Sequence, residues 1–147
     1  MDLFNSMDIS TSGIIAQRYR MNVASENMAN IESTRTANGG PYRRKQVVIG
    51  SVGDHTPFLD VLMGSYDAMP VLRGVSVMDV VEDPTPFRMV RRPGHPDADQ
   101  NGYVSMPNVN AVLEMADILS ATRAYEANIT AFSAAKSMIA KALELAK

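Results

Sequence analysis

The feature that most constrains this chain is its C-terminal stretch, residues 108–147, which contains neither proline nor glycine. Apolar or small residues recur there at alternating spacings of three and four, the heptad pattern of a helix that lies along another helix. These positions are Met115, Ile118, Thr122, Tyr125, Ile129, Phe132, Ile139 and Leu143, with Lys136 as the one charged break. We therefore predict a helix over 108–147 that packs along a second helix.

The start and the length of this helix add two constraints. Pro107 closes the preceding loop, and either Asn108 or Asn110 can act as the N-cap. Glu114 falls in the first turn, where the helix dipole favours an anion. A helix over 108–147 rises about 60 Å at roughly 1.5 Å per residue, whereas a compact chain of 147 residues is about 40 Å across. Either the protein is elongated, or the helix has partners outside its own chain.

A second helix is predicted near the N-terminus, over residues 3–32. The same spacing of three and four recurs there at Phe4, Met7, Thr11, Ile14, Arg18, Met21, Ser25 and Met28. This stripe is less apolar than the C-terminal one, so the helix needs a partner, and the C-terminal helix of the same chain is the natural one. Residues 10–13, Ser-Thr-Ser-Gly, favour a helix that starts late or has frayed first turns.

The middle of the chain has the pattern of short strands. Strand-like runs occupy residues 44–49, 58–63, 71–81 and 87–92, and prolines punctuate them. Residues 33–42 and 52–70 are predicted to be loops, and residues 93–110 to be a polar, turn-rich connection. The predicted fold is mainly α with a small β-rich insertion: an N-terminal helix within 1–33, the insertion at 34–107, and a C-terminal helix within 108–147, the two helices forming a coiled-coil-like pair.

Composition excludes several classes of protein. The formal net charge is −2 and cysteine is absent, so disulfide scaffolds, thiol catalysis and cysteine-based zinc sites are excluded. The short basic groups at 43–45 and 88–92 lack aromatic platforms, so we interpret them as solvated strand ends or salt bridges between subunits and expect no nucleic-acid partner. The sequence has no apolar run of the roughly eighteen residues that span a bilayer. Residues 1–10 do not resemble a cleaved secretory signal.

One segment resembles part of a calcium site. Oxygen-bearing residues at alternate positions, followed by glycine, match the first half of a calcium loop: Asp97, Asp99, Asn101 and Gly102. The twelfth position of that loop is Asn108 instead of a bidentate glutamate, and Pro93 and Pro96 prevent a normal entering helix. We therefore interpret the segment as a turn in which side chains bond nearby backbone, and we predict no metal and no cofactor.

A hydrolase would need a different combination of residues. The histidines are His55 and His95, and a metal-dependent hydrolase would combine His95 with Asp97 or Asp99 and a nucleophile such as Ser105. The motifs that accompany such chemistry, a nucleophile elbow, His-Glu-x-x-His or a phosphate-binding loop, are missing from the sequence. A loop histidine is the simpler interpretation, so we predict no catalytic residues and no small-molecule substrate.

Several segments, spread over almost the whole chain, resemble one known family. Asn27-Met28-Ala29-Asn30, followed by Ser33-Thr34, is similar to the Asn-x-Ala-Asn-x-x-Thr signature of bacterial flagellar rod, hook and hook-associated proteins. Residues 41–48, 93–110, 114–115 and 123–128 resemble the FlgC family of basal-body proximal rod proteins. The matching positions include Pro41, Tyr42, Gly94, Pro96, Asp97, Asn101, Gly102, Tyr103, Pro107 and Asn108.

The resemblance implies a structural subunit and no enzyme activity. Members of the family assemble helically into the rod, the drive shaft that crosses the periplasm and encloses the export channel, and are exported without signal cleavage. The implied partners are other copies, proximal and distal rod subunits, the rod-to-ring adaptor and the type III export apparatus. The helical stripes would then form an assembly seam, whose residues we predict to be Met7, Ile14, Met21, Met28, Met115, Ile118, Tyr125, Ile129, Phe132, Ile139 and Leu143.

Two alternatives of other kinds stay open at this point. The first is the metal-dependent hydrolase centred on His95, Asp97 and Asp99, which binding of Ca²⁺ or Zn²⁺ would reveal. The second is a cytoplasmic coiled-coil adaptor, since its helices and its N-terminus would have the same sequence pattern.

Overall fold

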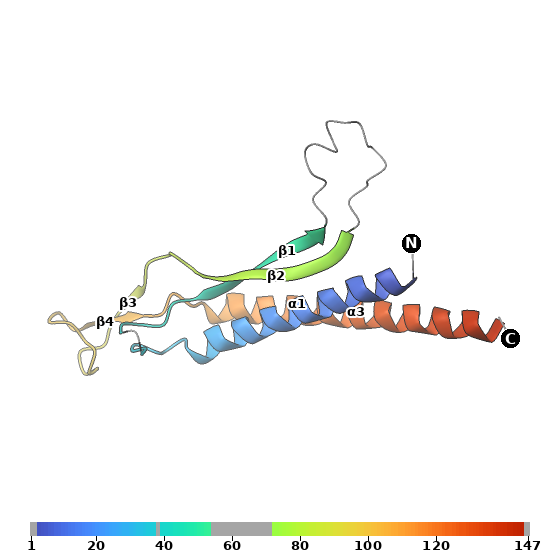
Figure 1. The fold of residues 1–147 in the computed structure, drawn as a ribbon. Helices are drawn as coiled ribbons and strands as arrows, with labels where there is room; N and C mark the ends of the chain where they lie inside the picture. Colours follow the sequence, from blue (N-terminus) through green and yellow to red (C-terminus); the bar gives the residue numbers. More distant parts are fainter. Residues whose placement is uncertain (1–2, 38, 54–71, 146–147) are drawn as a thin grey trace, which may run out of the picture.

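The computed structural model describes residues 3–37, 39–53 and 72–145. The molecule is elongated, with two long helices lying side by side (Figure 1): α1, Leu3–Ala29, and α3, Ala111–Leu145. Four strands come between them in sequence: β1, Lys45–Gly53; β2, Leu72–Glu82; β3, Arg88–Arg91; and β4, Tyr103–Met106. The predicted fold class, mainly α with a β-rich insertion between terminal helices, is confirmed.

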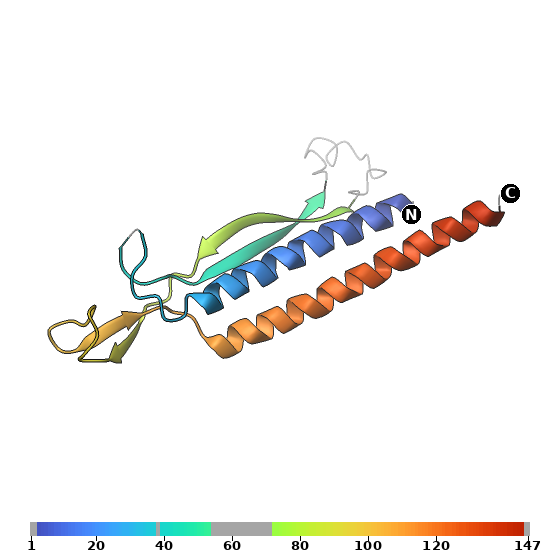
Figure 2. The same cartoon turned by 90° about the horizontal axis from the view of Figure 1, so that it is seen from below.

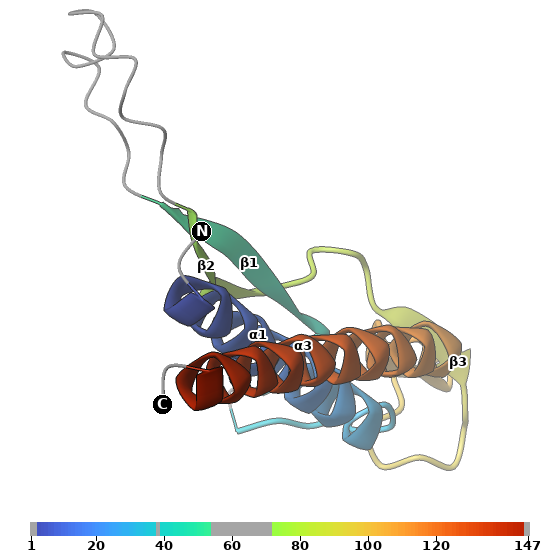
Figure 3. The ribbon, with the colours of Figure 1, turned by 90° about the vertical axis from the view of Figure 1, so that its right-hand side faces the viewer.

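The two helices run in opposite directions, and α1 is the middle layer of the molecule. It packs against α3 on one side and against β1 and β2 on another (Figure 3). At 35 residues, α3 is longer than the 27-residue α1, and its C-terminal end runs past the N-terminal end of α1 (Figure 2). In the described part of the chain, neither helix has the length and apolar character needed to cross a membrane.

Small residues fill the contact between the helices. On α3, Ala121 is 0% exposed and Ala135 is 2% exposed. On α1, a Cβ atom added to Gly13 would lie 2.9 Å from the side-chain amide of Asn128, so this side chain packs directly on the Gly13 backbone. The buried residues of α3 are thus shifted by one position from the predicted stripe: Ala121 is buried and precedes Thr122, which belongs to the stripe. Large apolar residues dominated the pattern in the sequence, but close packing of two helices favours small ones.

The serine- and threonine-rich patch does not delay the start of α1, so the prediction of a late start was wrong. The helix begins at Leu3 and continues through the patch. Each hydroxyl donates a hydrogen bond to a carbonyl of the preceding turn: Ser10 to Ser6, Thr11 to Met7, and Ser12 to Ile9, at 2.7–2.9 Å. These side chains therefore satisfy their polar atoms without leaving the helix.

The β1–β2 hairpin lies along α1. Its strands pair antiparallel from Lys45 opposite Glu82 to Gly53 opposite Leu72. The Ser12 hydroxyl of α1 accepts a hydrogen bond of 3.0 Å from the Val75 amide and so joins helix to sheet. The runs predicted at 44–49 and 71–81 are confirmed as strands, whereas the run predicted at 58–63 and most of the loop predicted at 52–70 lie outside the described residues.

A second, smaller hairpin lies at the end of the molecule where α3 begins. β3 confirms the strand predicted at 87–92, and it pairs with β4 from Arg88 opposite Met106 to Arg91 opposite Tyr103. The strand β4 was not predicted from the sequence, because turn-forming residues flank this short strand on both sides. Its buried side chains, Val104 and Met106, are each 1% exposed and anchor the hairpin.

Candidate functional site

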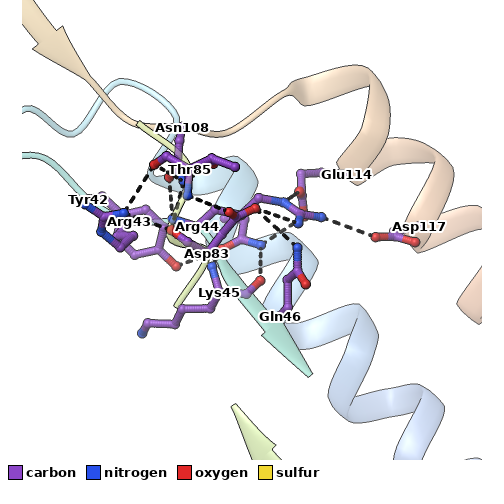
Figure 4. Close-up of polar contacts among 11 residues, drawn as sticks. Tyr42, Arg43, Arg44, Lys45, Gln46, Asp83, Thr85, Asn108, Glu114 and Asp117 are labelled. Atoms are coloured by element: carbon purple, nitrogen blue, oxygen red, sulfur yellow. Dashed lines mark hydrogen bonds and ion pairs between the residues drawn. The ribbon is translucent and has the colours of Figure 1, made fainter. Parts of the chain in front are cut away.

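A network of polar side chains joins the helices to the β insertion where α1 ends and α3 begins (Figure 4). We call it the junction cluster and define it as Asn27, Tyr42, Arg44, Asp83, Asn108 and Glu114. Asn27 lies near the end of α1, Arg44 immediately before β1, and Glu114 in the first turn of α3. Segments far apart in the sequence therefore meet at one point.

Asn27 is the centre of the junction cluster, and it is only 1% exposed. Its amide nitrogen donates to the Lys45 carbonyl at 2.8 Å and to the Glu114 carboxylate at 3.0 Å. Its amide oxygen accepts from the Lys45 backbone N–H at 2.9 Å and from the Tyr42 hydroxyl at 3.0 Å. One residue of the predicted family motif thus ties α1 to β1, to the loop before β1 and to α3.

A buried ion pair lies beside Asn27. The Arg44 Nε atom is 2.5 Å from a Glu114 oxygen, and the side chains are 16% and 1% exposed. The guanidinium also lies 3.5 Å from Asp83 and 3.6 Å from Asp117. Burial alone would lower the pKa of Arg44, but the hydrogen bonds and charges of Glu114 and then Asp83 together outweigh it and raise that pKa. The interpretation of Arg44 as a solvated strand end or a contact between subunits was wrong.

Asn108 and Asp83 extend the cluster to the loop after β2. The Asn108 side chain accepts from the Arg44 amide at 2.8 Å and donates to the Thr85 hydroxyl at 2.8 Å. It therefore does not cap α3; that role falls to Asn110, whose oxygen accepts from the Val112 amide at 3.0 Å. The hydrogen bond from the Thr85 backbone has the largest effect on the pKa of the Asp83 carboxyl and lowers it. The hydrogen bond from the Thr85 side chain and the nearby Arg44 lower it further.

Tyr42 closes the cluster on the side of the loop before β1. Burial of its ring, followed by the charge of Glu26, raises the pKa of Tyr42 to about 12. The phenol is therefore neutral at physiological pH and keeps the proton that it donates to Asn27. This hydrogen bond requires the protonated form, so alkaline pH acts directly on the junction.

A polar cavity of about 240 Å³ borders the junction cluster between α1, β1 and α3. Four of its charged lining residues pair with one another, Arg44 with Glu114 and Arg20 with Asp117 at 3.3 Å, whereas Lys45 pairs with Glu26 outside the lining at 2.6 Å. Charges that neutralise each other across a cavity hold elements together, whereas a binding site for a charged ligand needs unpaired charge. These ion pairs therefore connect α1 and α3 with each other and with the start of β1.

The rest of the family motif ties the loop after α1 to the second hairpin. The Ser33 hydroxyl donates to Asn30 at 3.0 Å, and the Thr34 hydroxyl donates to Asp97 at 2.8 Å. Arg35 forms an ion pair with the same carboxylate. The hydrogen bond from Thr34, opposed by desolvation and aided by the charge of Arg35, lowers the pKa of Asp97.

The residues of the possible calcium loop do not converge on a common point. Asp97 faces Thr34, whereas one Asp99 oxygen accepts from the backbone amides of Asn101 at 2.9 Å and Tyr103 at 2.7 Å. Gly102 completes the turn with a φ of 78°, a conformation that favours glycine. Over residues 3–37, 39–53 and 72–145, no group of three or more histidine, aspartate or glutamate side chains is placed to hold a metal ion.

Of the residues considered for a hydrolase, His95 and Asp97 lie close together, with Nδ1 and a carboxylate oxygen 4.0 Å apart, whereas His95 and Ser105 each bond another group. The Nδ1 atom of His95 accepts from the Asp97 amide at 3.1 Å, and the Ser105 hydroxyl lies 3.2 Å from the Met89 sulfur. A nucleophile must lie within hydrogen-bonding reach of its base, but these two side chains have other partners. His55, the other histidine considered, lies outside the described residues.

The predicted assembly seam divides into two sets of residues in a single chain. One set is half-buried: Met7, Ile14, Met21, Met28, Ile118, Tyr125, Phe132 and Ile139. The other set is exposed: Met115 by 53%, Ile129 by 39% and Leu143 by 66%. Sequence reasoning did not single out further exposed apolar side chains near the start of α3 and on α1: Val112, Leu113 and Leu119, and Ile15 and Tyr19.

Known proteins resemble this chain along its whole length. Residues 100–145 match the family described as flagellar basal body rod FlgEFG protein C-terminal. The FlgC basal-body rod protein of Bacillus subtilis is 44% identical, with all of both chains covered. Those of Salmonella typhimurium and Borreliella burgdorferi are 43% and 39% identical, each covering 99% of this chain and 98% of the relative. The chain belongs to the FlgC family of flagellar basal-body rod proteins.

Proposed function

We propose that this chain is a structural subunit of the proximal flagellar rod and assembles helically into the drive shaft that crosses the periplasm. The observation that carries the proposal is the exposed apolar surface of both helices. Large apolar side chains on α3 are 53–74% exposed at Val112, Leu113, Met115 and Leu119. Clustered apolar side chains of this kind are typical of surfaces that bind other proteins.

The energetics favour contacts between chains along α3. Complete burial of a large apolar side chain stabilises by roughly 1.5–3 kcal/mol. Ile129 and Leu143 lie in the predicted assembly seam but keep 39% and 66% of their surface exposed. Neighbouring subunits that cover them would gain part of this stabilisation at each contact. Many modest contacts, distributed along a helix, suit a stiff shaft built from small subunits.

The shape of the molecule favours an open assembly. The C-terminal end of α3 extends past α1 (Figure 1) and ends in exposed Leu143 and Leu145. Such an end reaches beyond its own subunit and contacts a different surface on the next one. Contacts between unlike surfaces that do not close into a ring generate a filament. In this arrangement the terminal helices lie near the axis and surround the export channel, while the β insertion lies further out.

As a rod subunit, the chain has its partners in the flagellar basal body. Other copies and the proximal and distal rod subunits cover the helical surfaces, and the rod-to-ring adaptor and type III export apparatus are further partners. The chain is exported without cleavage of a signal and acts without catalysis or cofactor. The relatives named as basal-body rod proteins, together with the paired charges around the 240 Å³ cavity, support this assignment.

Fractionation tests the proposal against a cytoplasmic adaptor. Basal bodies are purified from cells that produce the tagged chain, and its amount is compared with that in the cytosolic fraction. A rod subunit co-purifies with the basal body after detergent extraction of the membranes. Recovery of the chain in the cytosol alone would contradict the proposal. Calorimetry with Ca²⁺ and Zn²⁺ separately tests the hydrolase, and heat of binding at a single saturable site would favour it.

A further inference from the structure

Apolar residues repeat with a fixed period along both α1 and α3, which pack against each other. On α1, methionine or isoleucine recurs every seven residues: Met7, Ile14, Met21 and Met28. On α3, a large apolar side chain recurs at the same period: Ile118, Tyr125, Phe132 and Ile139. If one helix slides by a heptad, about 10.5 Å at 1.5 Å per residue, apolar side chains again meet apolar side chains. These contacts alone therefore distinguish weakly between registers.

The polar contacts between the helices do not repeat in this way. In the structure Asn27 opposes Glu114, and Gly13 opposes Asn128. A slide of one heptad along α3 would bring Ala121 opposite Asn27 in place of Glu114. The buried amide of Asn27 would then lose its carboxylate acceptor, since alanine has no polar side-chain atom.

Arg44 reinforces this preference from outside the helix pair. The loop that carries it is fixed to α1, because Asn27 bonds both the N–H and the C=O of the next residue, Lys45. Arg44 is therefore held at one position along α1, and Glu114 reaches it only when α3 lies in the observed register. Any slide separates Arg44 from Glu114, whose side chain is 1% exposed in the observed register, and so loses this buried ion pair.

We propose that Asn27, Arg44 and Glu114 select the register of α1 against α3. A buried polar residue at one position of a heptad interface is known to fix register, at some cost in stability. The inference concerns contacts within one chain and does not depend on the proposed function. It gives the first asparagine of the family motif a positioning role: it aligns the exposed faces of the helices.

Cysteine cross-linking tests the register directly, because the chain has no cysteine of its own. The pair Gly13→Cys with Asn128→Cys reports the observed register. The pair Gly13→Cys with Ala135→Cys reports a slide of one heptad. Each pair is placed in the full chain, oxidised at low protein concentration, and the intramolecular disulfide is quantified by mass spectrometry. When the rest of the sequence is unchanged, the chain that carries the first pair is expected to form the disulfide in high yield, and the chain that carries the second pair is not.

The decisive variant carries Asn27→Leu and Glu114→Leu, which remove the polar contact between the helices. We expect the yield of the shifted pair, relative to the observed pair, to rise about tenfold or more, which corresponds to about 1.4 kcal/mol of lost preference. If circular dichroism shows that this variant has lost its helices, Asn27→Leu alone serves instead, since it keeps the Arg44–Glu114 ion pair. A smaller rise in the shifted pair is expected there, because the Arg44–Glu114 ion pair still favours the observed register.

A matched control removes a different polar contact between the same helices. Arg20 pairs with Asp117 at 3.3 Å, but these side chains are 32% and 48% exposed. Arg20→Gln is therefore expected to leave the ratio of the two cross-links unchanged. An unchanged ratio in the helical Asn27→Leu variant, or an equal rise in Arg20→Gln, would overturn the proposal.

Discussion

Replacing Arg44 with alanine should destabilise the chain far more than an average substitution. The change leaves the Glu114 carboxylate, 1% exposed, with the 3.0 Å hydrogen bond from Asn27 but without its ion-pair partner. Removing one member of a buried ion pair typically costs about 3–5 kcal/mol, because the other charge stays buried and uncompensated. We expect a loss in this range, since Glu114 has almost no contact with solvent.

Urea unfolding followed by far-UV circular dichroism measures this loss. The matched control is Arg92→Ala, which breaks an ion pair with Glu32 at 3.6 Å where the side chains are 46% and 72% exposed. Exposed pairs contribute about 0–1 kcal/mol, so this variant should stay close to the parent chain. If Arg44→Ala loses less than about 1 kcal/mol, the junction cluster does not hold the helices to the insertion, and the reasoning fails.

Three further predictions concern pH, backbone and the turn. Folding raises the pKa of Tyr42 from 10.0 to about 12, so the contribution of Tyr42 to stability is complete below pH 10 and is lost as the pH rises toward 12. Urea unfolding measured across this pH range should show the loss of stability. The loss should be smaller in Tyr42→Phe. Gly74→Ala should cost about 1–3 kcal/mol, because φ is +106° and the new Cβ would lie 2.1 Å from the Ser12 hydroxyl; Gly39→Ala, with φ +81° and open space around it, should cost less in the same assay. The free energy of unfolding of Asp99→Asn should stay within about 0.5 kcal/mol of that of the parent, since an amide oxygen can accept the same backbone hydrogen bonds. A rise in Tm on addition of Ca²⁺ that occurs in the parent but not in Asp99→Asn would contradict this.

The sequence predicted the helices and the two strands of the first hairpin, though not their pairing, because the signals of these elements are local. Heptad spacing and the absence of helix breakers indicated α3, and alternating valines such as Val75 and Val77 indicated β2. The strand β4 was missed because four residues between turns carry too little pattern. Each of these outcomes depends on residues close together in the chain.

The junction cluster could not be predicted in the same way, because its partners are far apart in sequence. Arg44 and Glu114 are separated by 70 positions, and Asn27 and Glu114 by 87. From the sequence, Arg44 was interpreted as part of a short basic group at the surface, and Glu114 as a charge that is favourable in the first turn of a helix. The family motif gave the one available signal, since a buried polar role explains why asparagine stands at position 27.

The central claim is that the exposed face of α3 is an assembly surface. Ile129→Asp tests it most directly, because Ile129 is 39% exposed in the single chain and belongs to the predicted assembly seam. In the single chain, water can hydrate an aspartate at this position. A neighbouring subunit that covered it would have to desolvate a charge without giving it a partner. Glu126→Gln, also on the exposed surface of α3, is the matched control.

The measurement is the amount of each variant in purified basal bodies, paired with motility in soft agar and with circular dichroism of the purified chain. We predict that Ile129→Asp keeps the helix content of the parent, is absent from basal bodies and abolishes motility, whereas Glu126→Gln assembles and supports swimming. Normal assembly of Ile129→Asp would contradict the claim that this face of α3 packs against other subunits.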